Sequence, residues 1–430
     1  MTYYLEIEGE FYSMKMMTHT DTSTVDDALL TTPPVRVCMF VLELPARIQA
    51  RLMRDATALV KAGFNVTFVD VEDERTRPAE EEIEGVHFKH IFMSSWYTNT
   101  RFKPWFLVKL VLMYIRSTVR LLRTPADIYH VHVEKAFLPA YIAARLRRKP
   151  FIFDLPDLPF SDPHLTRWRV LTALSARLLA RMIRYCTRII TSSPLFAQEI
   201  HKCYPDSEVT VILNVPVYRA VTKSDRIRRY LGLEPDVRIA LWQGYIQPDR
   251  ELHRLVLAGA FLEPKTVIVV MGKSYRGVAS QLEALIAREG VADRVKIIPQ
   301  VPYEELLDWT ASADIGLISS SPNFSLSVRY ALPNKLFEYL MAGLPVLSLE
   351  VDSIANVLRT HDVGLVLSSL EPSAIAAGIN TMLADREALA RMQRNALEIS
   401  QNEFNWEKES PRLIRLYREI LALPGEERGE

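Results

Sequence analysis

The sequence has only three cysteines in 430 residues, at Cys38, Cys186 and Cys203. Their odd number and wide spacing argue against a disulfide framework or a cysteine-based zinc site and favour free thiols in a reducing compartment. The chain also lacks an uncharged apolar run of roughly 18 residues and a signal-like opening, so neither a membrane span nor secretion is expected. These absences predict a cytoplasmic protein.

The sequence has no overall excess of charge of one sign, because 52 lysines and arginines balance 52 aspartates and glutamates. A general affinity for nucleic acid is therefore not indicated. Residues 101–200 are an exception, with 17 basic and 6 acidic residues, and two predicted helices within them, Lys103–Arg123 and Leu165–Arg184, are strongly basic. Their aromatic residues are Trp105, Phe106, Tyr114 and Trp168. This pattern is typical of helices that bind anionic lipid, and core helices with solvated arginines are the alternative.

Length and hydrophobic periodicity predict two α/β domains. A chain of 430 residues exceeds one ordinary domain. Residues 1–34 are expected to form a flexible tail. Short apolar strands then alternate with amphipathic helices, beginning with Val35–Val41, Ala46–Ala62 and Asn65–Asp70, which predicts parallel sheets covered on both faces. The predicted units are 35–216, 217–403 and a C-terminal helix over 404–422.

One predicted strand ends in the sequence His130-Val131-His132. The two histidines share one face of the strand and so could bind a metal, but no cysteine or carboxylate lies at a recognised spacing nearby. Histidines at the carboxyl end of a strand beside a ligand cleft are the favoured interpretation, because open α/β sheets bind ligands there.

The most informative stretch is Pro333–Leu347, a short predicted helix that runs into a buried strand. Pro333 favours a helix start and Gly343 a helix end. Unpaired N–H groups at a helix start attract phosphate, and Lys335 adds a full positive charge. Glu338, one turn further on, is placed to accept two ribose hydroxyls. The stretch therefore predicts a nucleotide-sugar site.

These residues resemble the donor-site helix of the retaining glycosyltransferases of family 4, and the similarity extends over most of residues 35–422. The run Glu338–Gly343 matches the second half of the family's paired-glutamate motif, whereas Tyr330 occupies the position of the first glutamate. The resemblance implies a GT-B fold of two Rossmann-like domains, with a C-terminal helix that crosses back to the N-terminal domain. It also implies retention of anomeric configuration without an obligatory metal.

The resemblance further implies that donor contacts come from several loops of the second domain. Arg250 lies six positions after Gly244 and matches a family lysine in charge, while Tyr245 replaces a family arginine. A glycine after the next strand and a Val-Pro turn complete the pattern. The donor-binding residues expected are Gly244, Arg250, Gly272, Val301, Pro302, Tyr330, Asn334, Lys335, Leu336 and Glu338.

On the acceptor side the family frequently has Asp-x-His-Glu after a strand. Here Asp154 matches, Pro156 occupies the histidine position, and Asp157 replaces the glutamate. A simple Asp-Pro turn is the alternative for Asp157. The acceptor-side residues expected are His132, Asp154 and Asp157, with no metal ligand.

The function expected from this resemblance is transfer of a hexose from a nucleotide-sugar donor to a glycan or lipid-linked acceptor. Arg250, Lys335 and Asp157 are the expected catalytic residues, and no cofactor is expected. The expected location is cytoplasmic, peripheral on the inner membrane face, in glycan biosynthesis. Two alternatives remain: a degenerate nucleotide-sugar-binding subunit, because Tyr330, Tyr245 and Pro156 depart from the family, and a sugar-nucleotide 2-epimerase of the same fold.

Overall fold

The computed structural model describes residues 34–42, 45–72, 76–92, 103–158 and 169–422, and the side chains of 103–107 and 169–172 are not included. The expected tail therefore falls almost entirely outside the described residues, as do the loop residues Glu43 and Leu44 and the aromatic residue Trp168. Among the residues described, no helix combines the length and apolarity that crossing a bilayer requires.

The first domain is built on an eight-stranded sheet with the strand order β3-β4-β2-β1-β5-β6-β7-β8. All neighbouring strands run parallel except β3, which pairs antiparallel with β4. Their bounds are β1 Arg36–Phe40, β2 Asn65–Glu72, β3 Glu80–Ile83, β4 Val86–Phe92, β5 Ile128–His132, β6 Phe151–Asp154, β7 Arg188–Thr191 and β8 Val209–Val211.

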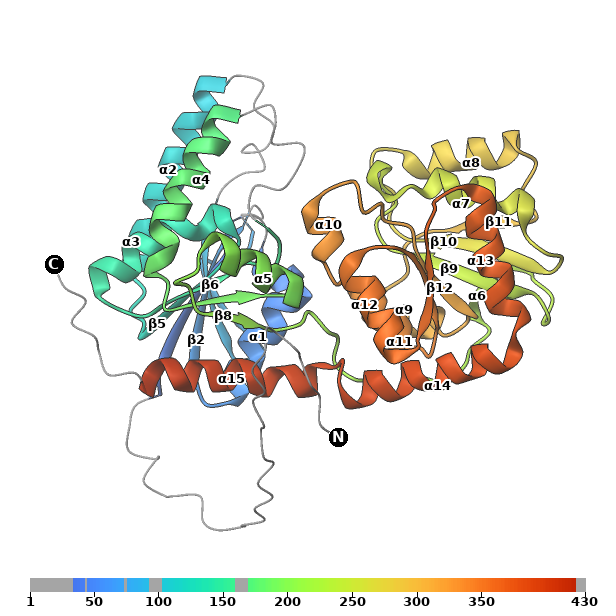
Figure 1. The fold of residues 1–430 in the computed structure, drawn as a ribbon. Helices are drawn as coiled ribbons and strands as arrows, with labels where there is room; N and C mark the ends of the chain where they lie inside the picture. The colour runs from blue at the N-terminus through green and yellow to red at the C-terminus, as the bar shows by residue number, and fades with distance from the viewer. Residues whose placement is uncertain (1–33, 43–44, 73–75, 93–102, 159–168, 423–430) are drawn as a thin grey trace, which may run out of the picture. The chain divides into compact units, whose positions relative to one another are not determined.

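Both faces of this sheet are buried, as the apolar composition of its strands predicts. Alternate residues of β1 enter different cores: Val37 and Met39 lie in one, Cys38 and Phe40 in the other. The first core includes α1, and the second includes α2, α3 and α4 (Figure 1). The helices are α1 Ala50–Lys61, α2 Lys103–Leu122, α3 Phe137–Arg147, α4 Arg169–Met182 and α5 Pro194–Cys203, with 3-10 turns η2 Ala46–Ile48, η4 Glu134–Ala136 and η6 Ile183–Tyr185.

The second domain contains a six-stranded sheet, entirely parallel, with the order β11-β10-β9-β12-β13-β14. Its strands are β9 Arg238–Gln243, β10 Thr266–Met271, β11 Val295–Ile298, β12 Ile315–Ile318, β13 Val346–Leu349 and β14 Gly364–Leu367. Alternate residues of β9 again enter opposite cores, with Ile239 and Leu241 in one and Ala240 and Trp242 in the other.

Helices cover both faces of the second sheet (Figure 1). Residues of α11 and α12 pack in the core that contains Leu241, whereas α7, α8 and α13 pack in the core that contains Trp242. The helices are α6 Arg226–Leu231, α7 Leu252–Ala258, α8 Val278–Arg288, α9 Tyr303–Thr310, α10 Leu326–Tyr330, α11 Asn334–Met341, α12 Asp352–His361, α13 Pro372–Ala384 and α14 Arg386–Asn402, with η7 Pro248–Arg250 and η8 Gly259–Phe261.

The last helix, α15 (Trp406–Ala422), follows α14 but contributes to the core of the first domain. Leu413, Leu416, Tyr417 and Ile420 are each at most 2% exposed in the core that contains Val37 and Met39. The predicted crossing of the C-terminal helix to the N-terminal domain is therefore confirmed, together with the two-domain α/β fold.

Two local features differ from the predictions. The sequence pattern placed no strand between Asp70 and Asp127, yet β3 and β4 extend the first sheet there. The predicted helix Ala46–Ala62 is divided into η2 and α1, because Gln49 has an extended backbone with φ −103° and ψ 99°. Helical periodicity does not reveal one extended residue within an otherwise helical run.

Candidate active site

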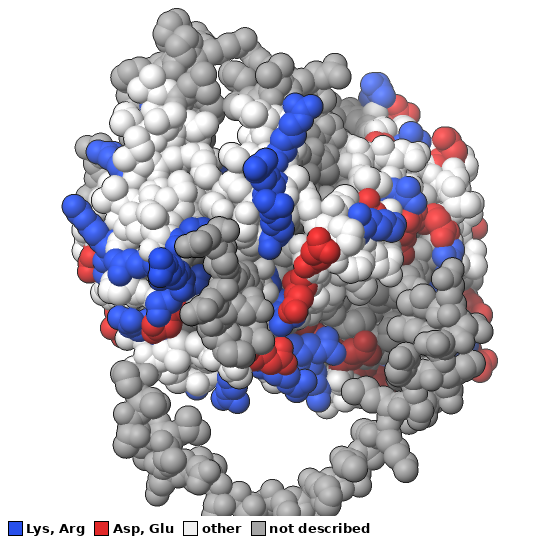
Figure 2. Space-filling view, turned by 60° about the vertical axis from the view of Figure 1, so that its left-hand side comes forward, with Lys and Arg blue, Asp and Glu red and all other residues white. Residues whose placement is uncertain are grey.

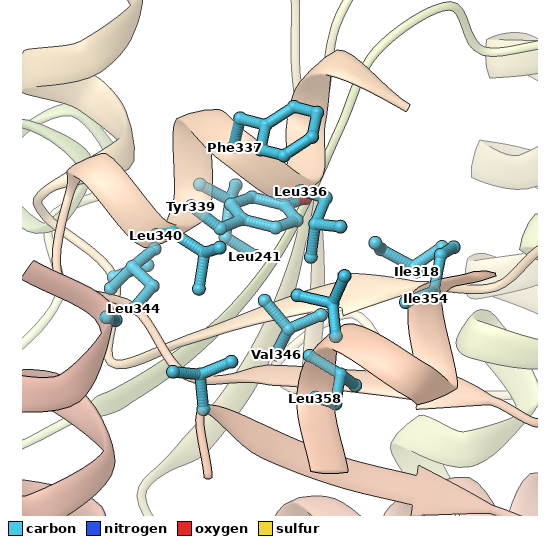
Figure 3. Close-up of a cluster of buried hydrophobic side chains, with 14 of the residues drawn as sticks. Leu241, Ile318, Leu336, Phe337, Tyr339, Leu340, Leu344, Val346, Ile354 and Leu358 are labelled. Carbon is cyan, nitrogen blue, oxygen red and sulfur yellow. The ribbon is translucent and has the colours of Figure 1, made fainter. Parts of the chain in front are cut away.

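The candidate donor site is organised around the start of α11. The helix is fixed by buried Leu336, Phe337, Tyr339 and Leu340, which belong to the hydrophobic cluster shown in Figure 3. The Tyr339 hydroxyl accepts a hydrogen bond from Gln243 N at 2.9 Å and donates to Leu317 O at 3.3 Å. These contacts fix the helix start beside the end of β9. Its first residue, Asn334, is exposed, and no side chain caps the helix start.

Lys335 lies against the end of β9. Its ammonium is 3.8 Å from the centre of the Trp242 ring, a cation–π contact. A Cβ built on Gly244 would lie 3.2 Å from the same Nζ atom, so the glycine lets the lysine approach the backbone. Burial, and then the positive charge of Arg250, lower the pKa of Lys335 to about 7, although Glu338 and Asp249 oppose this shift. The lysine is therefore poised between charged and neutral forms, and an added anion would favour the charged form.

Glu338 is held by a neighbour that the sequence analysis did not identify. Gln243 Nε2 donates to Glu338 Oε2 at 2.6 Å, and Gln243 Oε1 accepts from Thr310 Oγ1 at 2.8 Å. Burial raises the pKa of Glu338, while the bond from Gln243 and the charge of Lys335 oppose the rise. The position of Gln243 at the carboxyl end of a strand, directly before a glycine, was the available signal for its role.

Gly244 and Gly272 follow two adjacent strands and bring their backbones into contact. Gly244 has φ 136° and Gly272 has φ 152°, which side chains rarely tolerate. A Cβ on Gly272 would lie 1.8 Å from Gly244 O, so the close approach requires glycine. Gly244 N donates to Met271 O at 3.0 Å and extends the pairing of the two strands into the site.

Arg250 ends the turn η7 directly before α7. Its carbonyl accepts a bond from Ser319 Oγ at 2.6 Å, while its guanidinium lies 3.8 Å from Asp249 and remains one-third exposed, at 32%. The positive charge of Arg250 also contributes to the lowered pKa of Lys335. The structure thus brings Gly244, Arg250, Lys335 and Glu338 together.

The other predicted donor residues border this group with less specific contacts. Tyr330 ends α10, and its carbonyl accepts from Ser353 Oγ at 2.7 Å. Pro302 caps α9, and Val301 packs at the edge of the core that contains Leu241. Leu336 is fully buried and so supports the helix from within. Contacts of these residues with a nucleotide sugar remain predictions.

On the first domain, a buried polar network joins β5, β6 and α1. His132 Nδ1 lies 2.9 Å from Asp154 Oδ2, and Arg51 Nη2 donates to Asp154 Oδ1 at 2.8 Å. Burial alone would raise the pKa of Asp154, but Arg51 and then His132 lower it to about 2. His132 and Asp154 are each 1% exposed, so their side chains contact one another and Arg51 rather than solvent.

The network continues through His130 to the last helix. His130 Nδ1 and the Tyr417 hydroxyl share a hydrogen bond of 2.6 Å. Burial and the neighbouring His132 hold the pKa of His130 well below its ordinary value, so the ring is neutral. The sequence pattern showed no carboxylate beside the histidines, but strand pairing places Asp154 opposite His132. His130, His132 and Asp154 can offer ligand atoms within 4.8 Å of one another.

Asp157 lies outside this network. It follows Pro156 beyond the end of β6 and is exposed. The three predicted acceptor-side residues therefore differ in position: His132 and Asp154 are internal, whereas Asp157 is exposed, although partial desolvation raises the pKa of its carboxyl against the charges of Arg51 and Arg250. Arg51 and Tyr417, which hold the network, were missed because nothing in their local sequence distinguishes them from other residues on their helices.

Together, the two parallel-sheet domains and the crossing helix define a GT-B fold, and the similarity to solved structures agrees. Sucrose-phosphate synthase from Thermosynechococcus elongatus has a TM-score of 0.73 at 16% identity, covering 90% of this chain and 99% of the other. Anabaena Alr3699/HepE, solved in complex with UDP, has a TM-score of 0.69 at 16% identity, covering 90% and 100%.

Family models match both domains. Residues 50–215 match the model of Glycosyltransferase Family 4, and residues 223–399 match that of glycosyl transferases group 1. The chain therefore belongs to the family 4 type of glycosyltransferases.

Curated relatives match a smaller part of the chain. D-inositol 3-phosphate glycosyltransferase of Thermobispora bispora is 28% identical over 257 residues, which are 56% of this chain and 58% of the relative. D-inositol 3-phosphate glycosyltransferase 1 of Catenulispora acidiphila is 22% identical over 330 residues, 71% of this chain and 75% of the relative. This chain thus matches little more than half the length of the first of these relatives.

Proposed function

We propose that this protein is a glycosyltransferase that moves a hexose from a nucleotide-sugar donor to an acceptor with retention of configuration and without a required metal. The observation that carries the proposal is the arrangement at the start of α11, where Lys335 lies against Trp242 and Gly244, beside Arg250. A helix start with two cations is suited to a diphosphate.

In this proposal Arg250 and Lys335 stabilise the negative charge that develops on the diphosphate as the glycosidic bond breaks. Preorganised cations in a partly desolvated site are effective because they need little reorganisation during the reaction. Lys335 is charged most easily when the diphosphate is present, because its pKa of about 7 in the free protein rises beside an anion.

Glu338 is proposed to accept the ribose hydroxyls, with Gln243 holding its carboxylate in position at 2.6 Å. Gly272 and the Val301-Pro302 turn would present backbone groups to the nucleotide. The solved relative with bound UDP supports a uridine nucleotide as the first donor to test.

For the acceptor, we propose a glycan or lipid-linked molecule that approaches Asp157. Asp157, an exposed residue beyond the end of β6, would orient a hydroxyl, while the buried His132 and Asp154 hold the end of the sheet. The proposed location is cytoplasmic, with the protein peripheral on the inner membrane face.

A panel of nucleotide sugars, headed by uridine diphosphate sugars, tests this function through release of nucleoside diphosphate with and without lipid-linked and soluble glycan acceptors. Acceptor-stimulated release together with a new glycoside of unchanged anomeric configuration is expected. Tight binding without release would support a degenerate binding subunit, consistent with Tyr330, Tyr245 and Pro156 at family positions. Conversion of the donor into its 2-epimer would support an epimerase instead.

A further inference from the structure

The outward face of α2 is apolar, whereas the outward face of an ordinary surface helix is polar. Lys109 and Ser117, at 5% and 0% exposed, face inward, whereas a continuous row of aliphatic side chains faces outward. A helix on a globular protein normally buries its apolar stripe. The outward residues are Val108 at 45%, Val111 at 56%, Leu112 at 53%, Ile115 at 54% and Val119 at 41% exposed.

The outward face of α4 repeats this arrangement. Leu174 and Leu178, one helical turn apart, are 61% and 43% exposed, while Leu179 is buried. The buried residues of α2 and α4, including Met113 and Leu179, lie in the same core, so the two helices cover the same face of the sheet. Each helix already packs one face into the core of the domain. The exposed aliphatic rows are therefore additional apolar faces that the core does not use.

The charged side chains of the helices that carry these rows are all basic, although Arg120 of α2 forms an ion pair with Glu80 of β3 at 3.0 Å. Helices α2, α3 and α4 contain nine lysines and arginines and no aspartate or glutamate. Two of these nine, Arg145 and Arg147, lie at the end of α3, where Arg147 donates to Leu122 O; Arg145 and the additional Arg184 each lie 5.0 Å from the Tyr185 ring. Figure 2 shows broad uncharged surface in the upper left of the view, with lysine and arginine side chains at its edges and acidic side chains along the lower edge and the right-hand side.

From this surface we infer that the outward faces of α2 and α4 dock on a bilayer that contains anionic lipid. Exposed aliphatic side chains enter the boundary between headgroups and acyl chains, and arginines beside them contact lipid phosphates. A second copy of the chain fits less well, because a symmetric contact would bring together two sets of helices whose charged side chains are all basic.

The residues responsible differ from those suggested by the sequence. Tyr114 is only partly exposed and packs against the core, and the side chains of Trp105, Phe106 and Trp168 lie outside those described. The exposed aliphatic side chains of α2 and α4, rather than these aromatic residues, supply the apolar surface for docking. Docking itself does not require transferase activity; only the link to a lipid-linked acceptor depends on the proposed function.

Flotation of the whole protein with vesicles tests the inference. Co-flotation is expected with phosphatidylcholine containing phosphatidylglycerol, and it should weaken steeply as salt rises because screening shortens the reach of the charges. The double variant Ile115→Asp, Leu174→Asp should lower vesicle partitioning roughly tenfold or more. Arg116→Glu with Arg177→Glu should lower it mainly for the anionic vesicles.

Leu397→Asp provides the matched control, because Leu397 is a helical leucine that is 44% exposed on α14 in the other domain. This variant should float like the original protein. Circular dichroism checks folding, and nucleoside diphosphate affinity, expected to be unchanged in every variant, separates failure of docking from failure of the proposed function.

Absence of co-flotation at low salt, or equal flotation of the Ile115/Leu174 variant, would overturn the inference. Light scattering tests whether a second copy of the chain binds this surface instead. A dimer that the Ile115/Leu174 variant dissociates would identify these faces as a self-association surface and would also overturn the docking inference.

Discussion

Lys335 illustrates how a single side chain can make ligand binding dependent on pH. In the free protein its pKa is about 7, chiefly because of burial and then because of Arg250. A bound diphosphate favours the charged lysine, so above pH 7 binding must be accompanied by proton uptake. Between pH 7 and 9 we expect affinity for nucleoside diphosphate to fall by up to about tenfold per unit.

Titration calorimetry in buffers of different ionisation enthalpy measures this proton uptake directly. Lys335→Arg retains its charge across the range and should remove the pH dependence. A profile that is flat for the original protein, or equally steep in Lys335→Arg, would assign the effect to another group.

The removal of charge at the same site gives a second prediction. Lys335→Ala or Arg250→Ala should each eliminate a charge-assisted contact of about 1.5 to 3 kcal/mol, which is roughly tenfold or more in donor affinity. Arg288→Ala is a suitable control, because Arg288 is 72% exposed at the end of α8. Unchanged donor affinity in both site variants would show that neither Lys335 nor Arg250 contacts the diphosphate.

Glu338 is expected to recognise the ribose. Glu338→Gln should weaken binding of a ribonucleoside diphosphate by about 1.5 to 3 kcal/mol but leave its 2′-deoxy analogue less affected. The ratio of the two affinities is the informative measurement. A changed preference among sugars with an unchanged ratio would place Glu338 at the opposite end of the donor.

Individual site residues were predictable where a motif fixed them and unpredictable where only packing did. Lys335, Glu338 and Gly244 were identified from motifs, and the structure places them together. Gln243, Arg51 and Tyr417 hold their neighbours through contacts between elements distant in sequence. Such contacts have no local spacing by which to recognise them.

At the scale of elements, the close approach after β9 and β10 makes a prediction about stability. Gly272→Ala should lower the free energy of unfolding by about 3 kcal/mol or more, because its Cβ would overlap Gly244 O and its backbone is strained. It should also weaken nucleotide binding through displacement of the loop.

Gly290→Ala is the comparison for this experiment. Gly290 also has positive φ, at 66°, but a Cβ there meets no atom within 4 Å. Its cost should be limited to about 1 to 2 kcal/mol of backbone strain. Equal melting temperatures for the two variants would show that the approach of the two loops relaxes easily.

The parallel strands and the helix α11 were predictable because each combines a clear apolar period with a glycine or proline at its boundary. Strand β3 was not, because it is Glu-Glu-Glu-Ile and carries charge rather than apolar alternation; β4, Val86–Phe92, does alternate and was overlooked. The place of β3 at the edge of the sheet explains its composition, since an edge strand benefits from charge. Edge position is a property of the tertiary structure and is not visible in the strand's own sequence.

At the scale of the whole molecule, α15 connects the end of the chain to the first domain. Tyr417→Phe should lower the free energy of unfolding of that domain by about 1 to 3 kcal/mol, because it leaves buried His130 Nδ1 without its partner. Urea unfolding followed by fluorescence gives the midpoint. Tyr185→Phe, which removes a hydroxyl that accepts an exposed hydrogen bond from Arg184, should have little effect.

The packing of α15 also has a consequence for the order in which the protein is made. Residues 35–216 leave the ribosome first, but the core around Val37 is completed only by Leu413, Leu416 and Tyr417. At about 5 to 20 residues per second, the nascent first domain waits roughly ten to forty seconds for them. During that interval an apolar surface is open to chaperones, and a chain terminated before α15 would leave it open permanently.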